Sequence, residues 1–253
     1  TLDDKFKTYA DQLDKLGYCV IPSFFSSQED LDKLTAVKTE FEKAKEQNNL
    51  QYNNFYTEQS PHPLLTFDSV APIAFDDRLI EISKHYFQCI PVLNNVNLRK
   101  SKQSEKPEWE LPGAGLTTLY HCDKDGPRFL KFFFYLTDVG EDNGPFTYVE
   151  GSHLKKESNW RTDYRRDDQY IEKVYGTDRI KKLTGKVGDL IIANTSGWHK
   201  GTKVKEGERL LLTIYYNCHP TEWQSTFGGK MKKSDFEKLP EDKKPLADFL
   251  NKE

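Results

Sequence analysis

The sequence contains no long hydrophobic run and only four cysteines. No stretch approaches the roughly 20 apolar residues that cross a bilayer, so we expect no membrane partner. Residues 1–5 include three charged side chains and no apolar signal core, so no secretory signal is expected. The cysteines form no Cys-x-x-Cys pair, which favours reduced thiols and a cytoplasmic location; they are Cys19, Cys89, Cys122 and Cys218.

An excess of charge of one sign is also missing. The 37 basic and 40 acidic residues leave a net charge of -3, and without a basic field we expect no nucleic-acid partner. Aromatic residues are abundant, with 16 Phe and 13 Tyr, which is enough for a large core. A chain of 253 residues is compatible with one domain, because all-β barrels and sandwiches commonly reach this length.

The first 90 residues show helical patterns. Apolar residues at helical spacing predict a helix over 2–16, with Gly17 as its C-cap, and a short strand over 18–21. A capping box at 26–29 predicts a second helix over 28–46, and a third is expected over 76–88. The stretch 48–63, rich in Asn, Tyr and Pro, is interpreted as a loop. We expect this N-terminal part, residues 1–90, to buttress one face of a β-rich core.

Residues 91–218 carry strand patterns and predict a mainly β core. Strands are expected over 92–100 and 129–138, over the buried run that follows Gly188, from Trp198 onward, and over the apolar run 210–216. In the second of these, Lys131 and Phe133 share the face expected to line the interior. A polar C-terminal extension, 219–253, follows with short helices near 233–238 and 244–252.

The chemistry of the chain centres on His121-x-Asp123, followed by His199 and Arg209. On a strand, alternate side chains share a face, so His121 and Asp123 should point the same way. With a distant His they form a two-histidine, one-carboxylate set, which leaves metal positions open and suits non-haem Fe(II). Among the cysteines and other histidines we find no further ligand set at useful spacing.

With these motifs the sequence resembles the phytanoyl-CoA dioxygenase-like family of Fe(II)/2-oxoglutarate oxygenases. The resemblance runs from Gly17 to about Cys218 and includes the segments 133–144 and 151–153. It implies a double-stranded β-helix (a cupin-like jelly roll) with flanking N-terminal helices and with iron held by His121, Asp123 and His199. It also implies that O2 and 2-oxoglutarate are consumed, succinate and CO2 are released, and an unactivated C–H of a small molecule is hydroxylated.

The resemblance further assigns the distal carboxylate of 2-oxoglutarate to Arg209. A planar guanidinium suits this, because it pairs with both carboxylate oxygens and stays charged when buried. Asn97 and Arg99 match polar positions that contact the cosubstrate in the family, although a solvated sheet edge explains them equally well. Phe133 and Thr202 are further cosubstrate candidates. Lys131 is a competing anchor, since some related oxygenases use a lysine on this strand.

Two segments could cover the site. The loop 101–115 precedes the first metal ligands and is a candidate flap. The insertion 152–185 has an excess of basic residues and is either a solvated helix or a lid that recognises an anionic substrate. In the second case Arg161, Arg165 or Arg166 would meet the anion.

Two other functions remain open at this stage. The chain could be a metal-dependent hydrolase on a cupin-like barrel, or a barrel that binds a ligand without turnover. Halogenases of the family replace the carboxylate ligand by a small residue, so the presence of Asp123 favours hydroxylation. The identity of the small-molecule substrate and the oligomeric state do not follow from the sequence.

Overall fold

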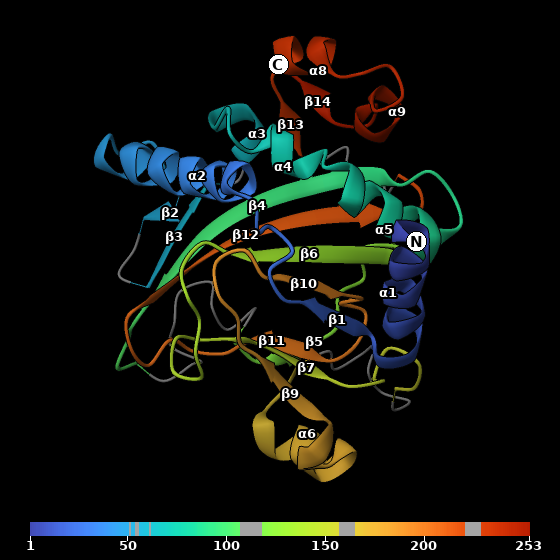
Figure 1. Cartoon of the computed structure of the whole chain (residues 1–253). Helices are drawn as coiled ribbons and strands as arrows, with labels where there is room; N and C mark the ends of the chain where they lie inside the picture. Colours follow the sequence, from blue (N-terminus) through green and yellow to red (C-terminus); the bar gives the residue numbers. More distant parts are fainter. Residues whose placement is uncertain (51, 54–55, 61, 107–117, 157–164, 221–228) are drawn as a thin grey trace.

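Two antiparallel sheets face each other in the computed structural model, which describes residues 1–50, 52–53, 56–60, 62–106, 118–156, 165–220 and 229–253 (Figure 1). The larger sheet has the order β1 (Tyr18–Ile21), β10 (Leu190–Ala193), β6 (Phe129–Tyr135), β12 (Glu208–Asn217), β4 (Val92–Lys102), β3 (Thr57–Ser60) and β2 (Tyr52–Asn53). The smaller sheet has the order β8 (Arg165–Arg166), β5 (Tyr120–His121), β11 (His199–Gly201), β7 (Phe146–Val149) and β9 (Ile180–Leu183). This arrangement is the expected cupin-like jelly roll.

Helices cover the outer face of the larger sheet, and Figure 1 shows α2 to α5 above it and α6 beyond the smaller sheet. The covering helices are α1 (Leu2–Leu16), α2 (Gln28–Glu46), α3 (Pro63–Thr66), α4 (Ala71–Ala74) and α5 (Asp77–Phe87). The helical turns α6 (Asp168–Tyr175) and η3 (Thr177–Arg179) precede β9. The C-terminal part contains β13 (Lys230–Met231), α8 (Lys233–Lys238), α9 (Lys244–Ala247) and β14 (Asn251–Lys252).

Alternation along β6 separates the core from the interior of the jelly roll. Leu130, Phe132 and Phe134 face the helices and belong to the main apolar core, as the sequence predicted. The opposite face of β6 carries Lys131 and Phe133 toward the smaller sheet. The larger sheet therefore has one apolar face, which the helices bury, and one mixed face, which is available for chemistry.

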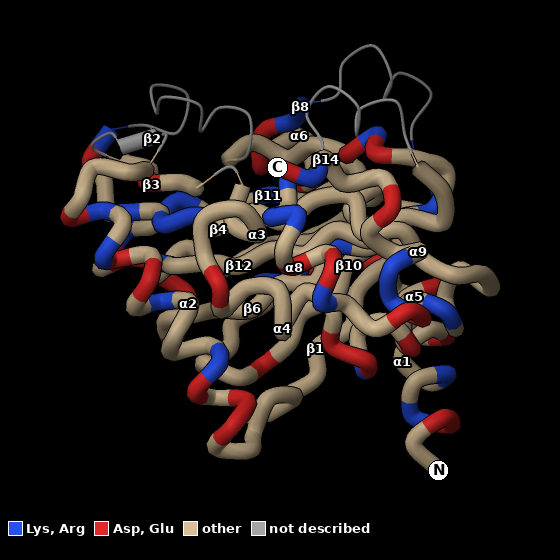
Figure 2. Tube along the Cα trace, turned by 90° about the horizontal axis from the view of Figure 1, so that it is seen from above, with Lys and Arg blue, Asp and Glu red and all other residues tan. Residues whose placement is uncertain are grey.

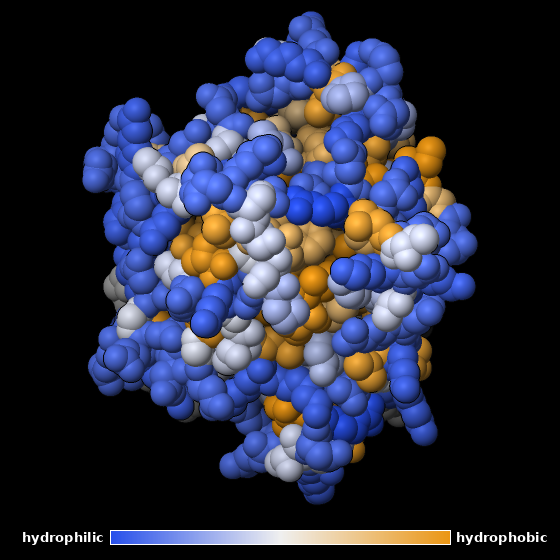
Figure 3. Space-filling model, viewed as in Figure 1, coloured by the Kyte–Doolittle hydropathy of each residue, from blue (hydrophilic) through white to orange (hydrophobic). Residues whose placement is uncertain are grey.

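The surface carries charges of both signs. Figure 2 shows acidic and basic residues interspersed along α1 and α2. Figure 3 shows a mostly hydrophilic face on which apolar side chains gather near the middle. Within the described ranges, no helix is long and apolar enough to cross a membrane.

Several expected elements differ in the structure. The predicted loop 48–63 contains β2 and β3, and β3 pairs with β4 through Thr57 and Ser101. The residues of β3 are polar, because one face of this strand continues the mixed face of the sheet. Their pattern therefore did not indicate a strand. The cap of α2 is Ser27, whose hydroxyl accepts from the backbone N–H of Asp30, rather than a box begun by Ser26. The last predicted helix ends at Ala247, and the chain finishes in β14.

The insertion 152–185 is more than a solvated helix. Its strand β9 pairs with β7, and β8 pairs with β5, so both belong to the smaller sheet. Its helix α6 buries Ile171 in a small cluster with Trp198 and Tyr120 on the outer face of that sheet. Most of the predicted flap 101–115 lies outside the described residues.

Candidate metal centre

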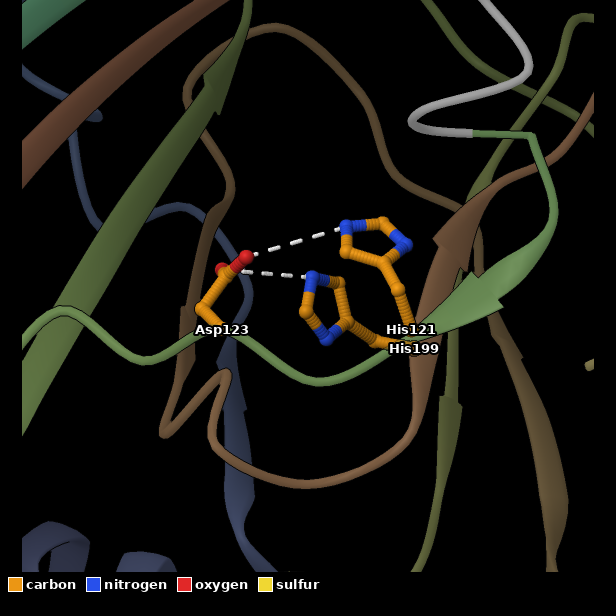
Figure 4. Close-up of side chains that lie close together, drawn as sticks. All are labelled: His121, Asp123 and His199. Carbon is orange, nitrogen blue, oxygen red and sulfur yellow. Dashed lines mark ion pairs between the residues drawn. The ribbon is translucent and has the colours of Figure 1, made fainter. Parts of the chain in front are cut away.

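The two histidines come together because β5 and β11 are neighbours. His199 pairs directly with His121, so both side chains project from the same face and their ring centroids lie 4.3 Å apart (Figure 4). Asp123 lies beyond the end of β5, where its backbone N–H donates to the carbonyl of Thr195 at 2.9 Å. The expectation that Asp123 continues the strand was therefore wrong, but its carboxylate still reaches the histidines.

The three ligand atoms converge at distances that suit one metal ion. The Nε2 of His121 lies 3.8 Å from Oδ1 of Asp123, and the Nε2 of His199 lies 3.4 Å from Oδ2 (Figure 4). All three potential ligand atoms lie within 4.8 Å of one another. Such a two-histidine, one-carboxylate face leaves the remaining metal positions open for other ligands.

The backbone fixes which imidazole nitrogen is available to a metal. Nδ1 of His121 lies 2.9 Å from the carbonyl of Leu119, and Nδ1 of His199 lies 2.9 Å from the carbonyl of Gly197. A carbonyl only accepts, so each Nδ1 carries a hydrogen, and Nε2 is the nitrogen of each ring that is left to bind a metal. Burial and, to a smaller extent, the neighbouring His199 lower the pKa of His121 to about 4, so His121 is neutral at physiological pH.

A lysine holds the carboxylate of Asp123. Nζ of Lys131 lies 2.5 Å from Oδ2 of Asp123 and 2.9 Å from a carboxylate oxygen of Asp125, and it sits 4.3 Å from the ring centroid of Tyr215. Burial alone would raise the pKa of Asp123, but Lys131 and His199 hold it well below its ordinary value. The carboxylate is therefore ionised and ready to bind a cation.

The triad opens into a cavity of about 240 Å³ between the two sheets. Of the residues predicted to contact the cosubstrate, Asn97, Arg99, Phe133 and Arg209 line this cavity. The hydroxyl of Thr202 instead lies 2.7 Å from that of Thr147, outside the lining.

Sequence reasoning missed three lining residues on β12, namely Leu211, Thr213 and Tyr215. Simple alternation from Arg209 along the strand would have placed all three on the interior face.

Arg209 is buried, and its guanidinium group has an N–H donor that is not used within the described residues. Its Nη1 donates to the carbonyl of Gly144, and its Nη2 lies 3.4 Å from the hydroxyl of Ser101. Its Nε is buried and has no partner among the described residues. An orphaned guanidinium donor in a cavity that also contains the triad fits a carboxylate ligand such as the distal end of 2-oxoglutarate.

The basic residues of the insertion are divided between two faces. Arg165 is opposite His121 in the β5–β8 register and shares its side, whereas Arg166 is opposite Tyr120 and lies 4.6 Å from the ring centroid of Tyr170. Arg166 is buried in this aromatic cluster on the far face of the sheet. Arg161 lies outside the described residues.

Comparisons with solved structures agree with this fold. HygX from Streptomyces hygroscopicus, with nickel and 2-oxoglutarate bound, is 19% identical with a TM-score of 0.61, and the match covers 85% of this chain and 87% of that one. The alpha-ketoglutarate-dependent epimerase SnoN from nogalamycin biosynthesis is 14% identical with a TM-score of 0.61, covering 85% and 83%. The carbocyclase SnoK from nogalamycin biosynthesis is 18% identical with a TM-score of 0.61, covering 83% of each chain.

The sequence comparisons identify a family rather than an individual relative. No curated protein matches the chain in sequence. A family model described as phytanoyl-CoA dioxygenase (PhyH) matches residues 13–207, a range that contains all three triad residues and ends just before Arg209. Because this match covers most of the chain and agrees with the fold and the triad, the chain belongs to the phytanoyl-CoA dioxygenase (PhyH) family.

Proposed function

We propose that this chain is an Fe(II)- and 2-oxoglutarate-dependent hydroxylase of a small molecule. The observation that carries the proposal is the presence, in one cavity, of a convergent His121–Asp123–His199 triad and a buried arginine with an unused donor. The triad presents two imidazole nitrogens and an ionised carboxylate, which is the donor set that Fe(II) takes in non-haem oxygenases. A dianionic cosubstrate needs both a metal and a cation at its far end, and the cavity provides for both.

Bound iron with 2-oxoglutarate supplies the activation of O2, coupled to release of succinate and CO2. The protein's own residues would bind and orient the metal and the cosubstrate. His121, Asp123 and His199 would hold the metal, and all three line the cavity. Arg209 would take the distal carboxylate, and Asn97 and Phe133 line the same cavity. Lys131 would keep Asp123 oriented through its hydrogen bond rather than bind the cosubstrate.

Hydroxylation is the reaction that the ligand set supports best. Asp123 stands at the position that a small residue takes in the family's halogenases, so a protein carboxylate would fill the place where those enzymes bind a halide. The similar structures include HygX with hygromycin B bound and SnoN with nogalamycin RO bound, which supports a small-molecule substrate here. SnoN and SnoK are an epimerase and a carbocyclase, so product analysis must identify the reaction.

The test is aerobic incubation with Fe(II), ascorbate and 2-oxoglutarate, followed by measurement of succinate. An oxygenase forms succinate slowly even without its substrate, whereas a metal hydrolase or a ligand-binding barrel forms none. A panel of small molecules that accelerates succinate release then identifies the substrate class. A product heavier by one oxygen supports hydroxylation, and a product of equal mass or lighter by two hydrogens contradicts it.

A further inference from the structure

The cavity contains three cationic side chains, but its acidic groups neutralise only one of them. Lys131 pairs with both Asp123 and Asp125. Among the described residues, no carboxylate lies within ion-pair distance of Arg209 or Arg99. Arg209 is buried and Arg99 is half-buried. Two guanidinium groups in one cavity repel each other, and each loses hydration without compensation unless an anion reaches it.

Arg99 lies on β4 and is held by a neutral side chain. It is opposite Gln59 of β3, whose Oε1 accepts from Nε at 3.2 Å and from Nη2 at 3.0 Å. These bonds use one edge of the guanidinium and leave the Nη1–Nη2 edge, where two parallel N–H groups match a carboxylate. Burial lowers the pKa of Arg99 and the nearby Arg209 lowers it further, as expected for a cation without a counter-ion.

The charges of the cofactors do not supply the missing anion. Arg209 is opposite Ser101, so Arg99 is its diagonal neighbour, with Cα atoms about 7–8 Å apart. In the proposed function, 2-oxoglutarate places one carboxylate on the metal and the other on Arg209. Asp125 would then balance Lys131, and Asp123 and the first carboxylate would balance the two charges of the metal. Arg99 would keep one positive charge that no other group in the described cavity offsets.

We propose that Arg99 binds a carboxylate of the substrate that is oxidised. This inference rests on the proposed function, and it differs from the expectation that Arg99 contacts the cosubstrate. A monoanion balances the single remaining charge, so a carboxylate fits better than a dianionic phosphate. The carboxylate lies on the β3–β4 side of the cavity, away from β6, where Lys131 contacts Asp123. The substrate class is therefore a small molecule that carries a carboxylate.

The test uses the full chain loaded with Ni(II) and saturating 2-oxoglutarate, and it measures binding by calorimetry. The probes are benzoate, its neutral counterpart benzamide, and inorganic phosphate. Wild type is expected to bind benzoate about tenfold or more tightly than Arg99→Gln, because a hydrogen bond to a charged group contributes about 1.5–3 kcal/mol. Arg99→Lys keeps the positive charge but loses the two parallel N–H groups. Its affinity for benzoate should therefore lie between those of wild type and Arg99→Gln. Benzamide should bind wild type and Arg99→Gln with equal affinity. Lys205→Gln, which removes an exposed charge, should bind benzoate as tightly as wild type does.

The outcomes separate this inference from the proposed function. If wild type with Ni(II) fails to bind 2-oxoglutarate, the proposed function itself is wrong. If 2-oxoglutarate binds but benzoate does not, or if phosphate binds more tightly than benzoate, only the inference is overturned. A loss of 2-oxoglutarate affinity in Arg99→Gln as large as that in Arg209→Gln would assign Arg99 to the cosubstrate and also overturn it. Unchanged 2-oxoglutarate affinity in Arg99→Gln, together with lost benzoate binding, supports it.

Discussion

At the scale of single residues, Asp123 belongs to the metal triad and also contacts Lys131. Its carboxylate faces both histidines and also accepts the hydrogen bond from Lys131. The spacing of His121, Asp123, His199 and Arg209 in the sequence predicted these residues as a set, because each lies in a recognisable local pattern. The contact between Lys131 and Asp123 could not be predicted, since it depends on how the chain turns after β5 ends at His121.

Replacing Asp123 by Ala should weaken Ni(II) binding by at least about 100-fold, because loss of outer-shell partners alone commonly costs 10- to 100-fold. The measurement is a metal titration followed by calorimetry. Asp125→Ala is the matched control, since Asp125 contacts Lys131 but is not among the converging ligand atoms. Equal metal affinities in wild type and Asp123→Ala would show that the triad is not the metal site.

Arg209→Ala should raise the dissociation constant for 2-oxoglutarate strongly, since truncating one partner of a buried charge pair costs about 2–5 kcal/mol. Lys131→Ala should change it much less, because Lys131 is engaged by two carboxylates. The Lys131→Ala substitution should instead change the affinity for the metal. The opposite ranking of the two variants would make Lys131 the anchor of the cosubstrate.

At the scale of elements, alternation predicted β6 and its two faces well, whereas β3 was missed. The four residues of β3, Thr57 to Ser60, are all polar, and no apolar alternation marks them. They are ordered by their pairing with β4, a contact between distant parts of the chain. Local pattern therefore identifies strands that have one apolar face and fails for strands whose residues are all polar, such as β3.

The turn before β11 depends on Gly197. A Cβ at this position would overlap the hydroxyl of Tyr148, which donates to the carbonyl of Asn194 at 2.8 Å. Gly197→Ala should therefore displace the turn that ends two residues before His199, and it should lower both thermal stability and Ni(II) affinity. Gly140→Ala is the control, because the nearest atom there is 3.2 Å away, on the side chain of Asn143. Identical metal affinity in Gly197→Ala and wild type would show that the turn does not position His199.

The start of α2 is joined to α5 by an ion pair. Arg78 donates to both oxygens of Asp30 at 3.0 Å and lies 4.6 Å from the ring centroid of Phe25. Asp30→Asn should lower the free energy of unfolding by about 1.5–3 kcal/mol, the typical contribution of hydrogen bonds to charged groups. Urea denaturation at neutral pH measures this difference.

The same pair gives a pH dependence. Burial would raise the pKa of Asp30, but the hydrogen bonds and charge of Arg78 hold it below its ordinary value. A depressed pKa contributes stability above the unfolded value of about 3.9, and the contribution is lost as pH falls through the folded pKa. The stability difference between wild type and Asp30→Asn should therefore narrow below about pH 4. A difference that is constant from pH 7 to pH 3 would contradict this explanation.

At the scale of the whole molecule, the two sheets bring together residues that are far apart in the chain. β5 and β11 carry the histidines on the smaller sheet, and β12 carries Arg209 on the larger one. The family resemblance predicted this architecture. It did not predict that Arg165 and Arg166 lie on opposite faces of a sheet, which follows from the β5–β8 register. The insertion that contains them contributes strands to the smaller sheet, and its role as a lid stays a prediction.

The central claim is that the triad and Arg209 bind the two ends of one 2-oxoglutarate. It is tested most directly by measuring the dissociation constant for 2-oxoglutarate twice, with metal-free protein and with protein saturated by Ni(II). One shared site predicts that the metal tightens 2-oxoglutarate binding by about tenfold or more, and that 2-oxoglutarate tightens metal binding by the same factor. Equal dissociation constants with and without Ni(II) would show that the two bind independently, and would contradict the account.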